Sequence, residues 1–478
     1  MSEANAPEAV DQIVSGTVVT MDGARRVIAD GAVAIRGDVV VAVGPAAEID
    51  AVFTAPVRRG GADAIVLPGF LDCHTHATQA LLRGLIAGEL PMIYRLYLPA
   101  DMALSPEEAH VAAKLCAAQL ARSGVTLVCD FETNVSDEHE EAVLAAMREV
   151  GVRCHFLRSR GDQEMHHAAL YSQIGDRSWR RQRIGEAEQD LARTAALIAR
   201  HADDPMVFVG VCPSGLTGFS DDYFRQAHAL STETAARLHV HAARDREEVE
   251  FCLSVFGRRP IEQLAELGVV DERLVVVHGM LASANEIALL GAARANLAHS
   301  AVEVANILAR VPDVPLMRRL GVKVGLGCDN AVNDMWIVMH SAWLMHTVTR
   351  GIAGYDPGVM DEGDVLAMAT SEAAAALGLD DRLGSLVPGK AADLVILDGT
   401  APHLGPVQDL MPELVRVGSR AEVQTVLVGG RAIVEGGELT SVDLPALQAE
   451  AAGIAKRLDA LVTPRRYTVP TGRRVLCC

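Results

Sequence analysis

Short apolar runs alternate with longer amphipathic stretches through the middle of this chain. Near-continuous apolar runs are typical of strands that are buried on both faces, and the amphipathic stretches carry apolar residues at helical spacing. Ser105 and Pro106 form a typical helix start before the stretch 106–122, and 138–150 has the same helical period. We expect strands at 126–129, 153–157, 207–211, 237–241, 274–278, 294–298 and 323–327.

A strand that ends near His74 completes eight β/α units. Eight parallel strands that alternate with helices predict an α/β fold of the closed (β/α)8 TIM-barrel type. We expect the apolar run 64–67, which is followed by the Pro68-Gly69 break, to be the strand that enters the barrel core. In such barrels the chemistry lies at the carboxyl ends of the strands.

The two ends of the chain carry short alternating strands of a different kind, which have too few members at either end to bury a core. We therefore expect both ends to pair into one small composite β-sandwich. The predicted domains are 1–63 for its first part, 64–385 for the barrel, and 386–478 for its second part and a tail. The expected strands are 12–19, 32–36, 39–43, 392–397 and 424–431.

The formal net charge of −19 argues against nucleic acid and anionic membrane surfaces as partners. No apolar run reaches the roughly 18–20 residues that span a bilayer, and the polar N-terminus does not resemble a signal peptide. The nine cysteines form no C-x-x-C pair, which fits reduced thiols. We expect a cytoplasmic protein that acts on a small-molecule substrate, and the large apolar fraction favours a homo-oligomer, a dimer or larger.

Histidines and one aspartate end several of the predicted barrel strands. His74 and His76 are two residues apart and point to the same face of a strand. His241 and Asp329 end two later strands, so that with the first pair they make a set of three nitrogen ligands and one oxygen ligand for a divalent ion. His278 ends the strand between them and could contact metal, water or substrate.

Two other histidines occupy the predicted strands. We expect His239 to point away from His241, toward the helices. His299 could be either a wall of the substrate pocket or a structural histidine.

The motif 68–76, the later His241, His278 and Asp329, and the segment 384–395 together resemble the amidohydrolase superfamily. Within it the chain is similar to the branch of triazine hydrolases and of cytosine- and guanine-type deaminases. The resemblance implies a metal-dependent (β/α)8 hydrolase with a composite β-sandwich. It also implies His74, His76, His241 and Asp329 as metal ligands, with His278 as a ligand or a water-orienting group.

The resemblance further bears on the number and kind of metal ions. Relatives with two metals use a carboxylated lysine at the end of the fourth strand, whereas here the segment 207–214 has no lysine and the nearest ones are Lys114 and Lys323. We therefore expect one divalent ion. Zn²⁺ is our first expectation, and Fe²⁺, Co²⁺ and Mn²⁺ suit the same ligands.

The expected chemistry is hydrolysis by metal-activated water. Asp329 would accept the water proton and pass it to the leaving nitrogen, and His278 would stabilise the developing negative charge. Both residues are therefore our candidate catalytic groups.

One residue departs from the deaminase pattern. Arg244 occupies the position three residues after His241, where deaminases of this branch carry a glutamate that shuttles a proton, and arginine cannot do this at neutral pH. Arg244 could bind a substrate carbonyl or carboxylate, or pair with a nearby acid such as Asp245 or Glu303. Glu132 and Glu164 could instead supply the acid.

This departure favours hydrolysis of amide, urea or carbamate C–N bonds, outside peptides, in an aryl or apolar small molecule, as in relatives that cleave phenylureas and thiocarbamates. The alternative is an aminohydrolase of a purine, pyrimidine or triazine, and a third reading is a non-enzymatic metal-binding protein. The candidate substrate-binding residues are Arg244, His299, Asn330, Trp336 and Phe131, and further pocket candidates are Met92, Tyr94, Leu96, Tyr97, Asn333 and Asp334. Cys477 and Cys478 have no assigned role.

Overall fold

The computed structural model describes residues 7–83, 97–132, 136–163, 185–307, 309–330, 332–405 and 408–462. Its centre is a barrel of eight strands, which form two parallel sheets in the orders β10-β9-β8-β7 and β11-β12-β13-β14. The sheets meet at the bridge between Val211 and Leu238, and on the other side the amide of Asp329 donates to the carbonyl of His74 at 2.8 Å. The strands are β7 (Phe70–Thr75), β8 (Val125–Glu132), β9 (Arg153–Arg158), β10 (Val207–Val209), β11 (Leu238–Ala242), β12 (Leu274–His278), β13 (Asn296–His299) and β14 (Lys323–Leu326). The expected TIM barrel is confirmed.

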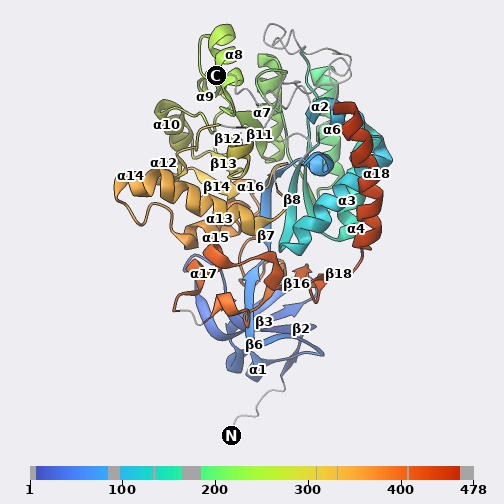
Figure 1. Cartoon of the computed structure of the whole chain (residues 1–478), viewed down its shortest axis with the longest axis vertical. Coiled ribbons are helices and arrows are strands. Elements are labelled where there is room, and N and C mark those ends of the chain that lie inside the picture. Colours follow the sequence, from blue (N-terminus) through green and yellow to red (C-terminus); the bar gives the residue numbers. More distant parts are fainter. Residues whose placement is uncertain are drawn as a thin grey trace, which may run out of the picture.

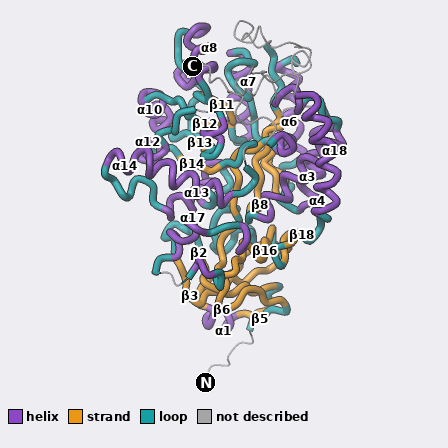
Figure 2. The backbone as a smooth tube through the Cα atoms, in the orientation of Figure 1, coloured by secondary structure: helices purple, strands orange, loops and turns teal. Residues whose placement is uncertain are grey.

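Helices surround the barrel on its outer side (Figures 1 and 2). The helix predicted at 106–122 is α3, and it begins with a capping box in which Ser105 and Glu108 each accept a hydrogen bond from the other's amide. The α-helices of the barrel layer and its loops are α2 (Leu98–Asp101), α3 (Pro106–Arg122), α4 (Asp137–Val150), α6 (Ala187–Arg200), α7 (Asp221–Thr234), α8 (Arg246–Phe256), α9 (Pro260–Glu266), α10 (Ala284–Ala293), α11 (Glu303–Asn306), α12 (Val314–Arg319), α13 (Met335–His346), α14 (Ile352–Gly354), α15 (Glu362–Met368) and α16 (Ser371–Leu377). Between them lie η1 (Ala77–Leu82) and the π-helical η3 (Thr347–Gly351).

Strands from both ends of the chain join in one eight-stranded sheet, in the order β18-β17-β16-β15-β6-β2-β3-β4, which lies at one end of the barrel (Figure 1). The strands are β2 (Gln12–Val19), β3 (Val27–Arg36), β4 (Val39–Pro45), β6 (Val57–Pro68), β15 (Leu394–Asp398), β16 (Val423–Val428), β17 (Arg431–Glu435) and β18 (Glu438–Leu439). Near them lie β1 (Glu8–Ala9), β5 (Phe53–Thr54), α1 (Ala46–Val52), η4 (Pro402–Leu404), α17 (Leu410–Val417) and η5 (Arg420–Glu422), and α18 (Leu444–Val462) packs along α3.

The expectation for 64–67 was wrong. These residues belong to β6 and pair antiparallel with β15, so that Leu67 lies opposite Val395 in the terminal sheet. The chain enters the barrel only after Gly69, where a Cβ atom would lie 2.3 Å from Oγ1 of Thr126. The close approach to β8 requires glycine here, and the first barrel strand is β7.

A buried ion pair joins the barrel to the terminal sheet. Arg153, at the start of β9, donates from Nε and Nη2 to the two carboxylate oxygens of Asp393, at 2.9 and 2.8 Å. Both side chains are 5% exposed. The amide of Gly429 also donates to Asp393, at 2.8 Å, so this one carboxylate ties β9 to the strands at the C-terminal end.

Across the described ranges, none of the helices combines the length and the apolarity that a membrane crossing requires. Exposed apolar side chains gather in the segment from α13 to the end of α14: Ile337, Leu344, Val348, Ile352 and Tyr355. Such side chains suit contacts between subunits, and the homo-oligomer stays a prediction.

Candidate metal centre

Five side chains predicted to carry the chemistry meet at the carboxyl ends of the barrel strands. Nε2 of His74 lies 3.5 Å from Oδ2 of Asp329, Nε2 of His278 lies 3.7 Å from the same oxygen, and Nε2 of His76 lies 4.0 Å from Oδ1. His241 joins His74 and His278 in a group whose candidate ligand atoms lie within 4.8 Å of one another. The spacing in the sequence thus predicted a real cluster in space.

An irregularity in β7 turns His74 inward. Cys73 packs in the interior of the barrel, and the ring of the next residue, His74, lies 4.5 Å from that of Phe131, which is also in the interior. Consecutive residues of a regular strand point to opposite faces. The register of β7 against β8 shifts between Asp72 and Thr75, and this shift allows both side chains to face the interior.

Backbone carbonyls fix the orientation of two imidazoles. Nδ1 of His76 lies 3.0 Å from the carbonyl oxygen of Phe131, and Nδ1 of His241 lies 2.8 Å from that of Ser214. Because a carbonyl only accepts, both Nδ1 atoms carry a hydrogen, and in a neutral ring Nε2 then presents a lone pair. This is the arrangement in which histidine binds a metal through Nε2.

The backbone at two of the strand ends is strained. Asp329 has a φ of 54° and His278 a φ of 76°, values in the left-handed region that non-glycine residues rarely adopt. The conformation at Asp329 is held by its amide, which donates to the carbonyl of His74, and by its own carbonyl, which accepts from Oγ1 of Thr75 at 2.9 Å.

Electrostatics set these groups in the protonation states that metal ligands need. Burial acts to raise the pKa of Asp329, but the imidazoles of His74, His278 and His76 outweigh it and hold that pKa well below its usual range. Burial is the largest cause that keeps the pKa of His241 and of His278 well below that of free histidine; at His278 the charge of Asp329 opposes it, and neighbouring imidazoles and Arg244 add to it at both. The carboxylate is therefore ionised and these imidazoles are neutral.

The donor set fits a divalent ion. Both ring nitrogens of His74, which is fully buried, have no hydrogen-bond partner among the described residues. Burying such groups without a partner costs free energy, which a cation bound to them offsets. Neutral imidazoles with one carboxylate are the ligands that Zn²⁺ and its neighbours in the first transition row prefer.

The ring of Phe131 packs against three imidazoles of this cluster. It is 1% exposed, and its ring centroid is 4.5 Å from that of His74, 4.7 Å from that of His241 and 5.8 Å from that of His76. A side chain in this position packs against the imidazoles, and its effect on a substrate would pass through them.

The expectation for His239 was wrong. Its ring lies inside the barrel, 5.8 Å from Phe131 and 5.1 Å from His155. The physical reason is the period of a strand: residues two apart share a face, so His239 points to the same side as His241, one layer deeper.

Two predicted substrate-binding residues lie away from the cluster. His299 is buried on the helix side of β13, where its Nε2 is 3.1 Å from Nε2 of His346 in α13; the preceding Ala298 occupies the inner face. Trp336 packs edge-on against Phe70, with ring centroids 5.1 Å apart, at the beginning of β7 and thus at the opposite end of that strand from His74. Neither position supports contact with a substrate.

Arg244 pairs with its neighbour. Its Nε donates to Oδ2 of Asp245 at 2.6 Å, and its amide donates to Oε2 of Glu248 at 2.8 Å. Asp245, one of the two partners that the sequence allowed, is in hydrogen-bond contact with Arg244, and the charge of Arg244 also acts on the other, Glu303. The charge of Arg244 still reaches the cluster, since it helps to lower the pKa of His278.

Of the other substrate-binding candidates, some are buried residues of known position and the rest lie outside the described residues. Asn330 lies beside the cluster, since its amide donates to Oδ1 of Asp329 at 2.8 Å and its Nδ2 donates to Gln79 at 3.0 Å. Tyr97 is 4% exposed, and burial, then the charges of Glu303 and Asp329, raise the pKa of its phenol. Asn333 donates to Gln119 on α3, and Asp334 caps α13. Met92, Tyr94, Leu96, Glu164, Cys477, Cys478 and the side chain of Glu132 lie outside the described residues.

Glu303, at the start of α11, was considered in the sequence only as a partner for Arg244. It is 4% exposed, and burial, then repulsion from Asp329, raise its pKa well above the usual value. A carboxyl group that stays protonated beside the cluster is a candidate acid. Nothing in the local sequence of Glu303 marks it, because its environment is built by residues far away in the chain.

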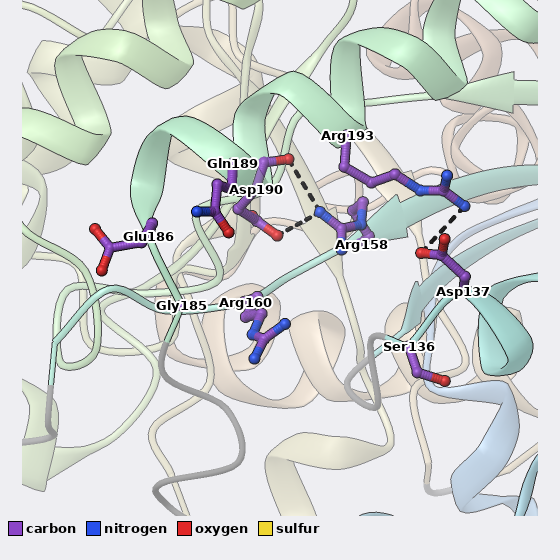
Figure 3. Close-up of a pocket in the computed structure, with 9 residues that line it drawn as sticks. All are labelled: Ser136, Asp137, Arg158, Arg160, Gly185, Glu186, Gln189, Asp190 and Arg193. Carbon is purple, nitrogen blue, oxygen red and sulfur yellow. Dashed lines mark hydrogen bonds and ion pairs between the residues drawn. The ribbon is translucent and has the colours of Figure 1, made fainter.

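A polar cavity of about 510 Å³ lies beyond the end of β9, between α4 and α6 (Figure 3). Two of the three arginines that line it are paired with carboxylates: Arg158 with Glu140 at 2.6 Å and also with Asp190, and Arg193 with Glu140 at 2.8 Å and with Asp137 at 3.4 Å. This cavity is therefore lined by ion pairs that connect α4 and α6. None of the candidate metal ligands lines it.

Comparison with known proteins gives the family. A model of the amidohydrolase family matches residues 65–433. The chain is 31% identical to a 5-methylthioadenosine/S-adenosylhomocysteine deaminase of Pelotomaculum thermopropionicum, over 93% of this chain and 98% of that protein. It is 30% identical to the protein of the same name from Nitratidesulfovibrio vulgaris, over 92% and 95%.

Two solved structures have the same fold. An adenosine deaminase from Xanthomonas campestris with bound zinc matches with a TM-score of 0.85 at 25% identity, over 95% of this chain and 100% of that one. An atrazine chlorohydrolase from Arthrobacter aurescens TC1 in complex with zinc matches with a TM-score of 0.81 at 21% identity, over 93% and 100%, and this likeness concerns the fold alone. These relatives give no support to the expected likeness to phenylurea and thiocarbamate hydrolases. The chain belongs to the amidohydrolase family, as a metal-dependent enzyme that hydrolyses carbon–nitrogen bonds other than peptide bonds.

Proposed function

We propose that this enzyme is an aminohydrolase, which replaces the exocyclic amino group of a purine-type heterocycle by the oxygen of water and releases ammonia. The observation that carries this proposal is the likeness, over 93% of the chain, to a protein named as a deaminase of two adenosine derivatives. The zinc-bound adenosine deaminase with the same fold supports it. The proposal takes the alternative that the sequence left open.

The interpretation as an amide, urea or carbamate hydrolase loses part of its support. It rested on Arg244 as a ligand for a substrate carbonyl, and the Nε of this guanidinium donates to Asp245. Arg244 instead helps to build the turn that leads into α8.

The proposed chemistry assigns the ligands first. His74, His76, His241 and Asp329 would hold one divalent ion, with Zn²⁺ as the proposed metal, and His278 would be a further ligand or a water-orienting group. When bound, the ion acts as a Lewis acid that activates water and polarises the carbon under attack. Asp329 would accept the proton of the water at Oδ2 and pass it to the leaving amino group. Nε2 of His278 lies 3.7 Å from this oxygen and can orient the attacking water.

Deamination of a purine ring also needs a proton on a ring nitrogen, and Arg244 cannot supply it. Glu303 offers one. Its Oε2 accepts a hydrogen bond from Nδ2 of Asn306 at 3.0 Å, which leaves Oε1 as the oxygen that carries the proton of the neutral acid. Burial, then the charge of Asp329, raise the pKa of Glu303 and favour its protonated form, and we assign it as the donor to the ring.

The test is product analysis on the full-length protein loaded with Zn²⁺. A panel of 6-aminopurine nucleosides, including adenosine and its 5′-thio derivatives, would be compared with aryl ureas and anilides. Ammonia from the nucleosides, with no amine from the ureas and anilides, is expected. Amine release from the aryl compounds without any ammonia from the heterocycles would overturn the proposal. A control with Asp329→Asn identifies activity that arises from contaminating enzymes.

A further inference from the structure

A second cluster of metal-binding side chains lies deeper in the barrel. Cys129 on β8, His155 on β9 and His239 on β11 present candidate ligand atoms that lie within 4.8 Å of one another. The three side chains are buried, with exposed fractions of 0%, 3% and 0%. They come from three strands, so they come together only when the barrel is folded.

The two imidazoles have ring nitrogens without a hydrogen-bond partner among the described residues. Neither ring nitrogen of His239 has a hydrogen-bond partner among the described residues, and the same holds for Nδ1 of His155. Their rings lie edge to face, with centroids 5.1 Å apart. A fully buried imidazole without partners costs free energy unless something binds its lone pair.

The local backbone leaves room for this arrangement. A Cβ atom on Gly210, which follows β10 between β9 and β11, would lie 2.9 Å from Nε2 of His155 and 2.4 Å from the side chain of Leu157. Glycine at this position therefore allows the imidazole of His155 to turn into the barrel toward His239.

We propose that Cys129, His155 and His239 form a second metal site, which binds a thiophilic d¹⁰ cation, Zn²⁺ or Cu⁺. A thiolate with two neutral imidazoles selects such ions over Mg²⁺ and Ca²⁺, which prefer oxygen ligands. The cation binds as the thiol of Cys129 loses its proton to solvent, and no oxidant or reductant takes part.

This second site is distinct from the candidate catalytic centre. The ring of Phe131 lies between the two, with its centroid 5.8 Å from that of His239 and 4.7 Å from that of His241. The two groups share no ligand. The inference therefore stands independently of the proposed reaction, and we assign the second site a structural role inside the barrel.

Metal analysis of the full-length protein tests the proposal. The stripped protein would be titrated with Zn²⁺, and separately with Cu⁺ under anaerobic reducing conditions. We expect about two ions per chain for the unmodified protein and about one for Cys129→Ala. Cys154→Ala removes another buried thiol on the neighbouring strand and should retain both ions. Binding of only one of the two cations at the second site would identify its occupant.

Spectroscopy of the unmodified protein tests the same proposal, even if the variants do not fold. Co²⁺ in the second site should give a thiolate-to-metal charge-transfer band, whereas the catalytic centre, with only nitrogen and oxygen donors, gives none. The band should persist in Cys154→Ala and disappear in Cys129→Ala or, if that variant fails to fold, in Cys129→Ser. One ion per chain with either metal and no thiolate band in the unmodified protein would overturn the proposal.

Discussion

Nε of Arg244 donates to Oδ2 of Asp245 at 2.6 Å, directly after the strand that carries His241. The other oxygen of Asp245 accepts from the amide of Glu248 at 2.8 Å and caps α8. Both side chains of the pair are largely buried, at 13% and 17% exposed. Arg244 thus stabilises the strand-to-helix turn, and the acid of the proposed deamination has to come from another element.

Arg244→Gln should therefore affect stability more than catalysis. We expect its free energy of unfolding to fall by about 1–2 kcal/mol, because one charged hydrogen bond is lost. We expect kcat/KM for a nucleoside to change by less than about tenfold. Urea denaturation and steady-state kinetics check both values. A loss of activity of about a hundredfold at an unchanged unfolding midpoint would show that Arg244 binds the substrate.

Asp329→Asn should abolish turnover and leave the fold intact. The amide retains the shape of the side chain but cannot accept the water proton, so we expect kcat to fall by about a hundredfold or more. Circular dichroism would verify the fold, and ammonia release would report the activity. Full activity in this variant is incompatible with the assigned proton transfer.

Glu303→Gln should lower kcat for nucleosides by about a hundredfold and leave the KM nearly unchanged, since it removes a proton donor and keeps the shape. Glu362→Gln is the matched control, because Glu362 is also a buried glutamate and pairs with Arg416 away from the cluster. A positioning role alone would leave the pH profile in place. If Glu303 is the acid, the fall of kcat at high pH that follows its deprotonation should disappear in Glu303→Gln and remain in Glu362→Gln.

The stability of the protein should fall as the pH rises through the range in which Glu248 is protonated in the folded state and ionised in the unfolded state. Burial raises the pKa of Glu248 from 4.5 to about 8. The folded state therefore holds this proton up to about pH 8, whereas the unfolded state releases it near pH 4.5. The unfolded state binds fewer protons in between, so the free energy of unfolding decreases with rising pH and levels off above this window.

Glu248→Gln keeps a neutral group at every pH. Its stability relative to the unmodified protein should rise between pH 4.5 and about pH 8 and then stay constant. Urea denaturation at several pH values measures the difference. A difference that does not vary with pH would mean that Glu248 ionises normally in the folded protein.

Asp393→Ala should weaken the connection between the barrel and the terminal sheet. Removing this carboxylate leaves the guanidinium of Arg153 buried without its partner, at a cost of about 3–5 kcal/mol. Asp398→Ala, at the end of β15, which begins directly after Asp393, is the control and should cost no more than about 1 kcal/mol. Equal losses in the two variants, measured by chemical denaturation, would contradict the importance of the buried pair.

The barrel was predictable because its signal is local. Several of the barrel strands are short apolar runs, and the helix 106–122 carries its own start in Ser105, Pro106 and Glu108. His241 and Asp329 were proposed as ligands because each ends or follows an apolar run, and His74 and His76 because they are two residues apart; parallel strands place such residues at one end of the barrel.

The remaining features depend on contacts between distant segments. Residues 64–67 are as apolar as a barrel strand, and only their pairing with β15 places them in the terminal sheet. Trp336 follows Asp329 closely in the sequence, but its side chain packs against Phe70 at the far end of β7. His299 and Glu303 likewise take their surroundings from α13 and from Asp329, which lie later in the chain.

Anomalous diffraction at the zinc edge, from crystals of the active protein loaded with Zn²⁺, shows whether a metal ion lies at the carboxyl ends of the barrel strands. We expect a peak bound by Nε2 of His76, Nε2 of His241, His74 and the carboxylate of Asp329. A protein that releases ammonia from its nucleoside substrate while no metal occupies this position would contradict this expectation.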